Sequence, residues 1–382
     1  MLAPKSPPEL AEILHQAASQ GRTLALAGNS TKRRMAGPVE AAEVCVSAAA
    51  LNRVLEYEPH DLTISVEAGL PWRELVRLLA ANRQVVPLDP PFAANATVGG
   101  VIASNSSGPR RRLYGTARDL VIGMKFATLE GKLVQSGGMV VKNVAGLDMA
   151  KLMIGSFGTL AAVAVVNFKL IPAPERERSF LLSFETLAAA IAARDRILQG
   201  GLQPAALDLL NPAAARTVGN EAWTLAIRAG GNAAVMDRYE HELSELAEGV
   251  ALDESEHESL WRHLEEFTPA HLAGHPDGAV VRASCTLKEV ADVMSSFSGP
   301  AVARAGSGVC YGYFEETPSA SAWLADAAAR GWKAVIEFAP DERRHTVDLW
   351  PAAGGDFEIM RRIKHLFDPQ NLLNRGRLYR RI

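Results

Sequence analysis

The spacing of apolar and polar positions divides the first 172 residues into short helices and strands. Apolar residues recur at helical spacing over 8–20, and Gly21 follows as an end signal. A second helix is predicted at 71–82, because Pro71 suits a first helical turn, where its missing N–H costs no hydrogen bond. Apolar runs typical of strands cover 23–27, 44–47, 62–67, 120–129, 132–136 and 160–171.

The pattern changes after 172, where Pro172 and Pro174 end a long strand and a run of charged residues follows. Helical spacing then alternates with short apolar strands. The helices are predicted at 186–199, 233–248, 254–266, 287–296 and 320–330, and the strands at 207–210, 223–228, 279–285, 301–305, 311–314 and 332–338. This order is typical of an α+β domain with an antiparallel sheet, so we place a domain boundary after Pro172.

One stretch, 91–115, fits neither pattern, because glycine and small polar residues dominate it and few of its residues favour an ordinary helix or strand. Gly99, Gly100 and Gly108 let the backbone approach a flat or charged group closely. Its neutral hydrogen-bonding side chains are Asn95, Thr97, Ser104, Asn105 and Ser107. A large, mostly uncharged ligand suits this composition, and a surface loop rich in turn-forming residues is the alternative.

Two further places favour close backbone contact with a ligand. The predicted strand 23–27 leads into Gly28-Asn29-Ser30-Thr31-Lys32, whose successive N–H groups would form a nest for an anion such as pyrophosphate. Gly155 and Gly158 bracket Ser156-Phe157 just before a long strand, downstream of Lys142 and Asn143. Ordinary tight turns are the alternative at both places. No GxGxxG motif follows the first strand, which argues against a nicotinamide-binding Rossmann domain.

Composition excludes several classes of protein. The 382 residues provide enough chain for two domains, and a net charge of −3 gives no electrostatic reason to expect nucleic acid. No apolar run approaches the roughly 18 to 20 residues of a spanning helix, and the N-terminal residues lack a secretory apolar core, so we expect a cytoplasmic protein whose membrane contact is only through partners. Cys45, Cys285 and Cys310 lie singly, which excludes a four-ligand iron–sulfur site and argues against a disulfide framework.

The stretch 91–115 and the segment 137–160, GGMVVKNVAGLDMAKLMIGSFGTL, together resemble the FAD-binding domain of the vanillyl-alcohol oxidase/p-cresol methylhydroxylase superfamily. The resemblance covers the whole chain, is most specific over 97–172, and is closest to the FAD-binding subunits of bacterial glycolate oxidases. It implies an α+β fold with a two-part FAD-binding domain over 1–172. An α+β cap with an antiparallel sheet would follow over 173–365, and a C-terminal segment, 366–382, would pack back on the FAD domain.

The same resemblance implies noncovalent FAD, because the covalent members use a histidine in or near the first loop and none lies within 27–38. In the closing segment FDPQNLLNRGRLY, Asn374 and Gly376 match the family pattern, although Arg375-Gly376-Arg377 replaces the usual Pro-Gly-Lys. The residues expected to contact FAD are Ala27, Gly28, Asn29, Ser30, Thr31, Lys32, Pro91, Thr97, Val98, Gly99, Gly100, Ser104, Asn105, Ser107, Gly108, Gly115, Asp119, Gly155, Gly158, Thr159, Asn374 and Gly376.

The catalytic residues are unknown from the sequence. Oxidation of a 2-hydroxy acid needs a cation for the carboxylate and a base for the hydroxyl proton. Related catalytic subunits and D-lactate-type dehydrogenases carry a metal-associated signature with His and Glu in the second half of the cap, where this chain reads ARAGSGVCYGYF. The weak candidates left there are Arg304, Tyr311 and Tyr313, and no metal site is expected.

The resemblance implies an FAD-dependent oxidoreductase and leaves three functions open. The favoured one is the FAD-binding subunit of a multi-subunit glycolate oxidase, which converts glycolate to glyoxylate and passes electrons among a second flavoprotein subunit, an iron–sulfur subunit and a quinone pool. The second is a stand-alone FAD-dependent 2-hydroxyacid dehydrogenase of the D-lactate type. The third is a structural flavoprotein subunit without catalysis of its own.

Overall fold

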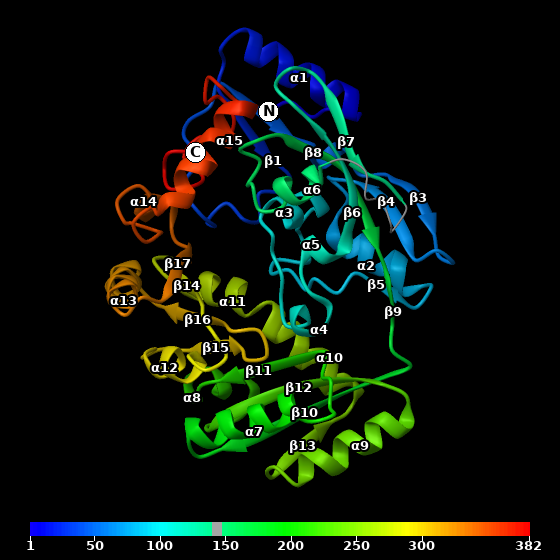
Figure 1. Cartoon of the computed structure of the whole chain (residues 1–382), viewed down its shortest axis with the longest axis vertical. Coiled ribbons are helices and arrows are strands. Elements are labelled where there is room, and N and C mark those ends of the chain that lie inside the picture. The colour runs from blue at the N-terminus through cyan, green and yellow to red at the C-terminus, as the bar shows by residue number, and fades with distance from the viewer. Residues whose placement is uncertain (140–146) are drawn as a thin grey trace. The chain divides into compact units, whose positions relative to one another are not determined.

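The computed structural model of the chain describes residues 1–139 and 147–382, which form two compact units (Figure 1). The first unit comprises 1–107, 116–173 and 352–382, and the second comprises 108–115 and 174–351. The structure thus divides the chain near the predicted boundary, and it groups 108–115 with the second unit. The domain ranges 1–172, 173–365 and 366–382 stay predictions.

The first unit is built on a five-stranded antiparallel sheet in the order β3–β4–β8–β6–β7. Its strands are β3 Val54–Glu58, β4 Thr63–Glu67, β6 Val121–Ala127, β7 Leu133–Gly137 and β8 Ala162–Lys169. The central strand β8 reads as a continuous apolar run because both of its faces are covered. Val166 and Phe168 belong to one core cluster, whereas Ala164 and Val165 belong to another.

Shorter elements surround this sheet. Two strand pairs, parallel β1 Leu24–Ala27 with β2 Val44–Ser47 and antiparallel β5 Gln84–Val85 with β9 Ile171–Pro172, lie outside it. The helices are α1 Pro7–Ser19, η1 Ala48–Ala50, α2 Trp72–Ala80, α3 Val98–Ala103, α5 Ala117–Leu120, α6 Met149–Met153 and α15 Gly355–Phe367. Helix α1 begins where predicted, because Ser6 caps it and prolines occupy its first turn.

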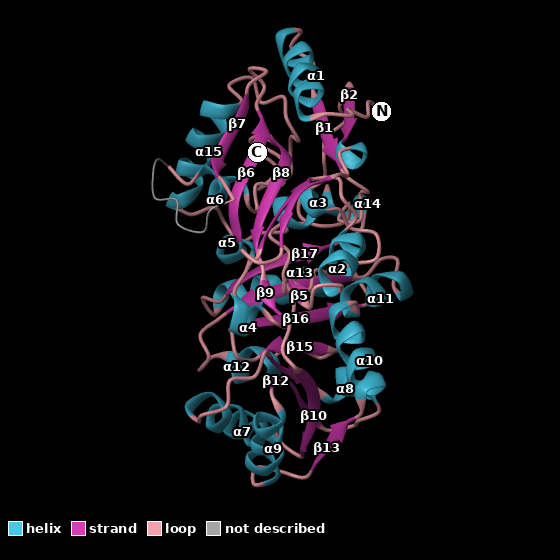
Figure 2. Cartoon of the chain, turned by 90° about the vertical axis from the view of Figure 1, so that its right-hand side faces the viewer, coloured by secondary structure: helices cyan, strands magenta, loops and turns pink. Residues whose placement is uncertain are grey.

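The second unit is built on an eight-stranded antiparallel sheet in the order β13–β10–β12–β11–β15–β16–β14–β17 (Figure 1). Figure 2 shows part of this order, with β10 and β12 between β13 and β15. The strands are β10 Arg176–Phe184, β11 Ala206–Leu210, β12 Trp223–Gly231, β13 Gly249–Leu252, β14 Ala279–Ser284, β15 Ala301–Arg304, β16 Val309–Phe314 and β17 Lys333–Phe338. The helices are α4 Arg111–Tyr114, α7 Leu187–Gln199, α8 Pro212–Ala215, η2 Arg216–Val218, α9 Ala233–Ser244, α10 Glu254–Glu265, α11 Phe267–Gly274, α12 Val290–Ser295, α13 Thr317–Ala329 and α14 Asp341–Arg344.

The two faces of the eight-stranded sheet differ in chemistry. One face packs with α7, α9, α12 and α13 into a single apolar core that contains Leu225, Val281 and Trp323. Because side chains alternate along a strand, the residues next to the core positions lie on the opposite face. That polar face carries charged and hydroxyl side chains, and it is the part of the second unit with candidate chemistry.

Several elements were not predicted from the sequence, including β3, β13 and α11, and the structure gives a physical reason for two others, β10 and α3. Strand β10 was not expected, because its charged start looked like a domain exit. Glu177 lies on the polar face, where it pairs with Arg228, Arg178 pairs with Glu240 of α9, and Phe180 and Leu182 fill the core. Helix α3 lies inside the glycine-rich stretch 91–115, where no ordinary helix was expected. It forms because the Thr97 side chain accepts a hydrogen bond from the Gly100 N–H and because Val98, Val101 and Ile102 are fully buried.

Candidate functional site

A cavity of about 270 Å³ lies within the first unit. Its lining comes from the chain after β1, from helix α3, from the turn before β8 and from the C-terminal segment. The predicted residues that line it are Ala27, Gly28, Asn29, Ser30, Thr31, Lys32, Thr97, Gly99, Gly100, Ser104, Gly158 and Asn374. The three segments singled out for close backbone contact therefore meet around one space.

The loop after β1 forms one wall of the cavity. Ser30 takes a left-handed conformation, with a φ of 56°, and a left-handed residue is one component of the nest conformation that binds anions. Lys32 is buried, and it lines the cavity together with Arg33, so the loop adds positive charge to its N–H donors. The Asn29 amide donates to the Asn95 carbonyl at 3.0 Å, which ties this loop to the glycine-rich stretch.

Gly28 and helix α3 lie too close to each other for a side chain at Gly28. A Cβ placed on Gly28 would lie 2.3 Å from Thr97 Oγ1, so only glycine fits at this contact. A Cβ on Gly99 would lie 2.8 Å from the Ala68 Cβ, so this glycine allows α3 to pack on the chain after β4. Gly100 differs from both, because a Cβ there would meet Thr97 Oγ1 alone, at 3.2 Å, and Gly100 lines the cavity.

Asn374 connects the remaining walls. Its Oδ1 accepts a hydrogen bond from the Leu26 N–H at 2.7 Å, and its Nδ2 donates to the Phe157 carbonyl at 2.8 Å. Gly158, with a φ of 68°, passes so close that a Cβ there would lie 2.8 Å from Asn374 Nδ2. One amide side chain thus fixes β1 and the turn before β8 at the edge of the cavity.

The other predicted contact residues lie outside the cavity lining. Val98 and Thr159 are buried, and Gly155 and Asn105 take left-handed conformations beside each other. Asp119 closes the capping box of α5 with Thr116. Pro91, Ser107 and Gly376 belong to the first unit, whereas Gly108 and Gly115 belong to the second. Lys142 and Asn143 fall outside the described residues.

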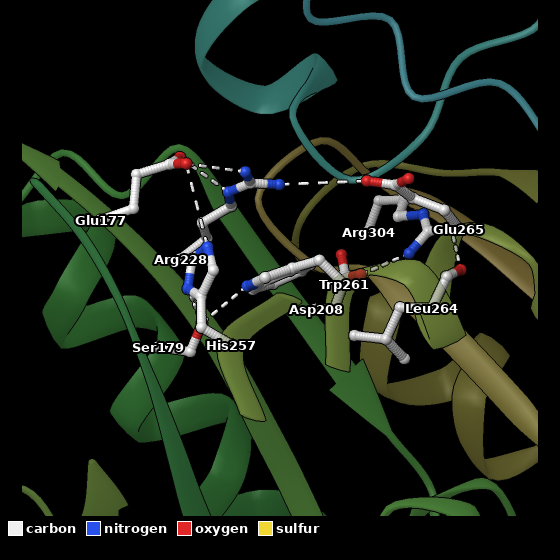
Figure 3. Close-up of polar contacts among 9 residues, drawn as sticks. All are labelled: Glu177, Ser179, Asp208, Arg228, His257, Trp261, Leu264, Glu265 and Arg304. Carbon is white, nitrogen blue, oxygen red and sulfur yellow. Dashed lines mark hydrogen bonds and ion pairs between the residues drawn. The ribbon is translucent and has the colours of Figure 1, made fainter. Parts of the chain in front are cut away.

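The polar face of the second unit contains the three weak catalytic candidates. Arg304 is buried and forms an ion pair with Asp208, and its Nη2 donates to the Leu264 carbonyl at 3.2 Å (Figure 3). Tyr313 contacts Thr268 Oγ1 at 3.3 Å, and burial raises its pKa. Burial likewise raises the pKa of Tyr311, whose ring lies 5.7 Å from the Arg304 guanidinium carbon. Arg304 already has a carboxylate partner, which weakens it as a substrate-binding cation.

A hydrogen-bond network lies beside these residues on the same face (Figure 3). Arg228 binds both oxygens of Glu177, at 2.9 and 3.0 Å, and reaches Glu265 at 3.9 Å. His257 lies between Ser179, with Nδ1 at 2.7 Å from Oγ, and Glu177, with Nε2 at 3.8 Å from Oε2. Ser179 is fully buried, which excludes it as an exposed nucleophile and indicates a structural network.

Acidification is expected to destabilise the fold through His257. Burial, assisted by Arg228, lowers its pKa below the ordinary 6.5, and Glu177 only partly opposes this. Below pH 6.5 the unfolded chain therefore binds a proton at His257 more readily than the folded chain does. The free energy of unfolding falls accordingly as the pH drops below 6.5. Denaturant unfolding at about pH 7.5 and about pH 5.5 measures the effect. His257→Gln should show a smaller pH dependence, and equal dependence in both proteins would contradict this role.

Sequence comparisons place the chain in a known family. Residues 1–137 match the FAD binding domain family. Residues 173–355 and 352–378 match the C-terminal domain of FAD linked oxidases. The chain belongs to the FAD-linked oxidases. FAD is accordingly the cofactor of this oxidoreductase, and the superfamily resemblance seen in the sequence is confirmed.

Curated relatives of this FAD-linked oxidase share about a third of their residues with it. It is 34% identical over 161 residues to glycolate oxidase subunit GlcD of Bacillus subtilis, covering 42% of this chain and 34% of that protein. It is 33% identical over 196 residues to glycolate oxidase subunit GlcE of Escherichia coli, covering 51% and 54%. It is 32% identical over 167 residues to D-lactate dehydrogenase of Anaerostipes hadrus, covering 44% and 35%. The chain thus spans about a third to a half of these relatives.

Solved structures confirm the fold of this FAD-linked oxidase. Alkyldihydroxyacetonephosphate synthase matches with a TM-score of 0.73 at 17% identity, covering 97% of this chain and 75% of that one. 4-Ethylphenol oxidase from Gulosibacter chungangensis matches with a TM-score of 0.73 at 14% identity, covering 98% and 88%. The predicted α+β class is therefore correct. Within the described ranges, no helix combines the length and the apolarity that a membrane span requires.

The lining of the cavity fits FAD in the donors that it offers. Consecutive backbone N–H groups beside Lys32 and Arg33 suit a pyrophosphate, and hydroxyl and amide groups suit the ring and sugar atoms. Sequence reasoning missed several lining residues. Phe157 lies between Gly155 and Gly158, the glycine pair that the sequence singled out. Arg377 is a basic residue of the closing segment, and its guanidinium carbon lies 5.0 Å from the centre of the Phe157 ring. The other missed residues are Leu10, Ala25, Leu26, Arg33, Val39, Val46, Ala48, Ala68, Ala103, Ala161, Ala162 and Val163.

The polar face of the second unit holds further charged groups that the sequence did not single out. Arg282 Nε lies 3.0 Å from Glu337 Oε1, and Arg282 is directly opposite Tyr311 in the β14–β16 register. Burial raises the pKa of Glu337, although Arg282 and Arg111 oppose the shift. A signal for them existed only in the sequence of β14 and β17, where Arg282 and Glu337 each interrupt a run of apolar residues.

Proposed function

We propose that this FAD-linked oxidase is the FAD-binding subunit of a multi-subunit glycolate oxidase, which converts glycolate to glyoxylate. The meeting of the loop after β1, helix α3, the turn at Gly158 and Asn374 around one cavity carries the proposal. The 33% identity to the GlcE subunit, over about half of each chain, supports the choice of enzyme. Its proposed partners are a second flavoprotein subunit and an iron–sulfur subunit, and its proposed place is the cytoplasm, with membrane contact only through these partners.

Each wall of the cavity would have a distinct task. FAD, when bound, accepts a hydride at its ring and passes the electrons on. The N–H groups of 28–32 and the Lys32 cation would bind the pyrophosphate, because both present positive charge to it. Gly100 would let the cofactor approach the backbone of α3. Ala162 and Val163 would exclude water from the opposite wall.

An absorbance spectrum of the purified chain, taken before and after anaerobic glycolate, tests the proposal. We expect the isolated chain to contain stoichiometric flavin and to keep its yellow absorbance with glycolate alone. Bleaching should require the partner subunits, because the substrate would be oxidised elsewhere in the complex. Colourless protein that gains no flavin absorbance when incubated with FAD would contradict the proposal and would favour a structural subunit.

A stand-alone 2-hydroxyacid dehydrogenase is the second candidate, and one observation favours it. Glu337, with its raised pKa, lies beside Arg282, and the Arg111 cation is close enough to act on both. A carboxylate whose pKa is raised is a suitable general base, and two arginines suit a substrate carboxylate. This second function also requires that the chain oxidises its substrate without partner subunits, whereas the favoured function relies on them.

The same spectrum separates the two candidates. Bleaching of the isolated chain by glycolate or D-lactate would favour the dehydrogenase. In that case Glu337→Gln should abolish bleaching without loss of bound flavin, since the variant removes the base and its ion pair with Arg282, neither of which lines the flavin cavity. The matched control is Glu358→Gln on α15. The Glu358 carboxylate is half exposed in a surface ion pair with Arg361, so the flavin of this variant should bleach at the wild-type rate.

A further inference from the structure

Two cysteines that lie far apart in the sequence are neighbours in the second unit. Cys310 is fully buried on β16, and Cys285 is half-buried directly after β14. Their sulfur atoms lie 3.9 Å apart. The β14–β16 register sets Ala283 opposite Cys310, and the Cys285 N–H donates to the Gly308 carbonyl at 2.8 Å, so paired backbone holds both thiols in place.

A buried cation lies near this thiol pair. Arg194, on α7, is 2% exposed, and its Nε and Nη2 both bind Asp195 Oδ1, at 2.9 and 2.6 Å. Its Nη1 has no hydrogen-bond partner among the described residues. The hydrogen bond from Cys310 lowers the pKa of the Cys285 thiol, with a smaller contribution from Arg194, while burial and Glu289 partly oppose the shift. Burial and the same contact raise the pKa of Cys310. Cys285 is therefore the better nucleophile of the two at neutral pH.

We propose that Cys285 and Cys310 form a peroxide-reactive dithiol that closes reversibly to a disulfide within the sheet of the second unit. In the first step the Cys285 thiolate attacks an oxygen of hydrogen peroxide, which forms an S–O bond, breaks the O–O bond and releases hydroxide. In the second step Cys310 sulfur attacks the resulting sulfenic acid and displaces the second oxygen, which leaves as water after protonation. Two thiols and one peroxide give one disulfide and two waters.

The surroundings favour oxidation over metal binding at this pair. Within the part of the chain that the structure describes, no third cysteine, histidine, aspartate or glutamate joins this pair in a group that could hold a metal ion. The two sulfur atoms already lie 3.9 Å apart across the β14–β16 pair, so a disulfide would join neighbouring sulfur atoms after a local adjustment of the side chains and of the chain at the end of β14. The third cysteine, Cys45, lies exposed on β2 and serves as the internal reference.

Peptide mapping of the full chain after brief treatment with hydrogen peroxide tests the proposal. We expect a Cys285–Cys310 cross-linked peptide, the loss of two of the three thiols in a thiol titration, and recovery of both with dithiothreitol. The melting temperature should rise on oxidation and return on reduction, because the link restricts the unfolded chain. The Cys45→Ser variant should lose its two remaining thiols, those of Cys285 and Cys310, just as the wild type loses these two.

Two variants locate the reactive sulfur. Cys310→Ser should accumulate a sulfenic acid at Cys285 that dimedone traps, and Cys285→Ser should leave Cys310 reduced and the melting temperature unchanged by peroxide. The proposal would be overturned if Cys45 oxidises while Cys285 and Cys310 remain thiols, or if these two oxidise separately without a cross-link. Both outcomes are read on the wild type, so they do not depend on the folding of a variant.

Discussion

Gly100→Val is expected to abolish FAD binding while the chain still folds. Gly100 lines the cavity, and a Cβ added there would meet only Thr97 Oγ1, at 3.2 Å, which the side chain can relieve with a small rotation. The rest of the valine would point into space that we assign to the cofactor. We expect Kd to rise at least about a hundredfold, or about 2.8 kcal/mol. Flavin absorbance of the purified protein and a fluorescence titration with FAD measure this.

The matched control is Gly274→Val at the end of α11, where a Cβ would meet nothing within 4 Å. Both positions are helical glycines, so the backbone cost of valine is similar, and the control should keep stoichiometric flavin. Circular dichroism and the melting temperature verify that both variants fold. If folded Gly100→Val retains stoichiometric flavin, the assignment of the cavity to FAD fails.

Lys364→Met is expected to cause the largest loss of stability, about 3 to 5 kcal/mol. Lys364 is buried, and its Nζ donates to Asp368 Oδ2 at 2.7 Å, to the Thr159 carbonyl at 2.8 Å and to the Leu373 carbonyl at 2.9 Å. Removal of the ammonium leaves the fully buried Asp368 carboxylate without its counter-charge. Urea unfolding followed by tryptophan fluorescence measures the change.

Arg361→Ala is the control for this prediction, because it removes an ion pair from the same helix. The Arg361 and Glu358 side chains are 67% and 51% exposed, so water already solvates the charges and the loss should stay below about 1 kcal/mol. A loss in Lys364→Met that is no larger than in Arg361→Ala would show that the buried pair adds nothing to stability. A loss of flavin in Lys364→Met is also expected, because α15 leads into the segment that carries Asn374.

The periodicity of apolar residues predicted most of the elements, but it failed where charged or glycine-rich residues interrupt the apolar pattern. Helix α1 and the hairpin of β6 and β7 follow directly from spacing, capping and turn residues. Strand β10 was missed because its start is charged, and those charges pair with residues more than 50 positions away in the sequence, as Glu177 does with Arg228 on β12 and Arg178 does with Glu240 on α9. Pattern rules use only residues that are close in the sequence, so they cannot predict which charged residues pair across a sheet.

The candidate site was predictable to a similar degree. Glycine-rich composition and the family resemblance indicated the loop after β1 and helix α3, which do line the cavity. The apolar lining, such as Val163, could not be separated from ordinary core residues, because both are buried and aliphatic. The nearness of Cys285 and Cys310 was also beyond the sequence, since their spacing of 25 residues carries no signal until β14 and β16 pair.

Asn374 is synthesised after the two segments of the cavity wall that its side chain connects. It lies 348 residues after Leu26, and its amide holds β1 against the turn at Phe157. During translation the ribosome therefore releases the walls of the cavity long before the residue that fastens them. Flavin capture should accordingly follow the emergence of Asn374 from the ribosome, and nascent chains stalled before Asn374 should emerge without cofactor.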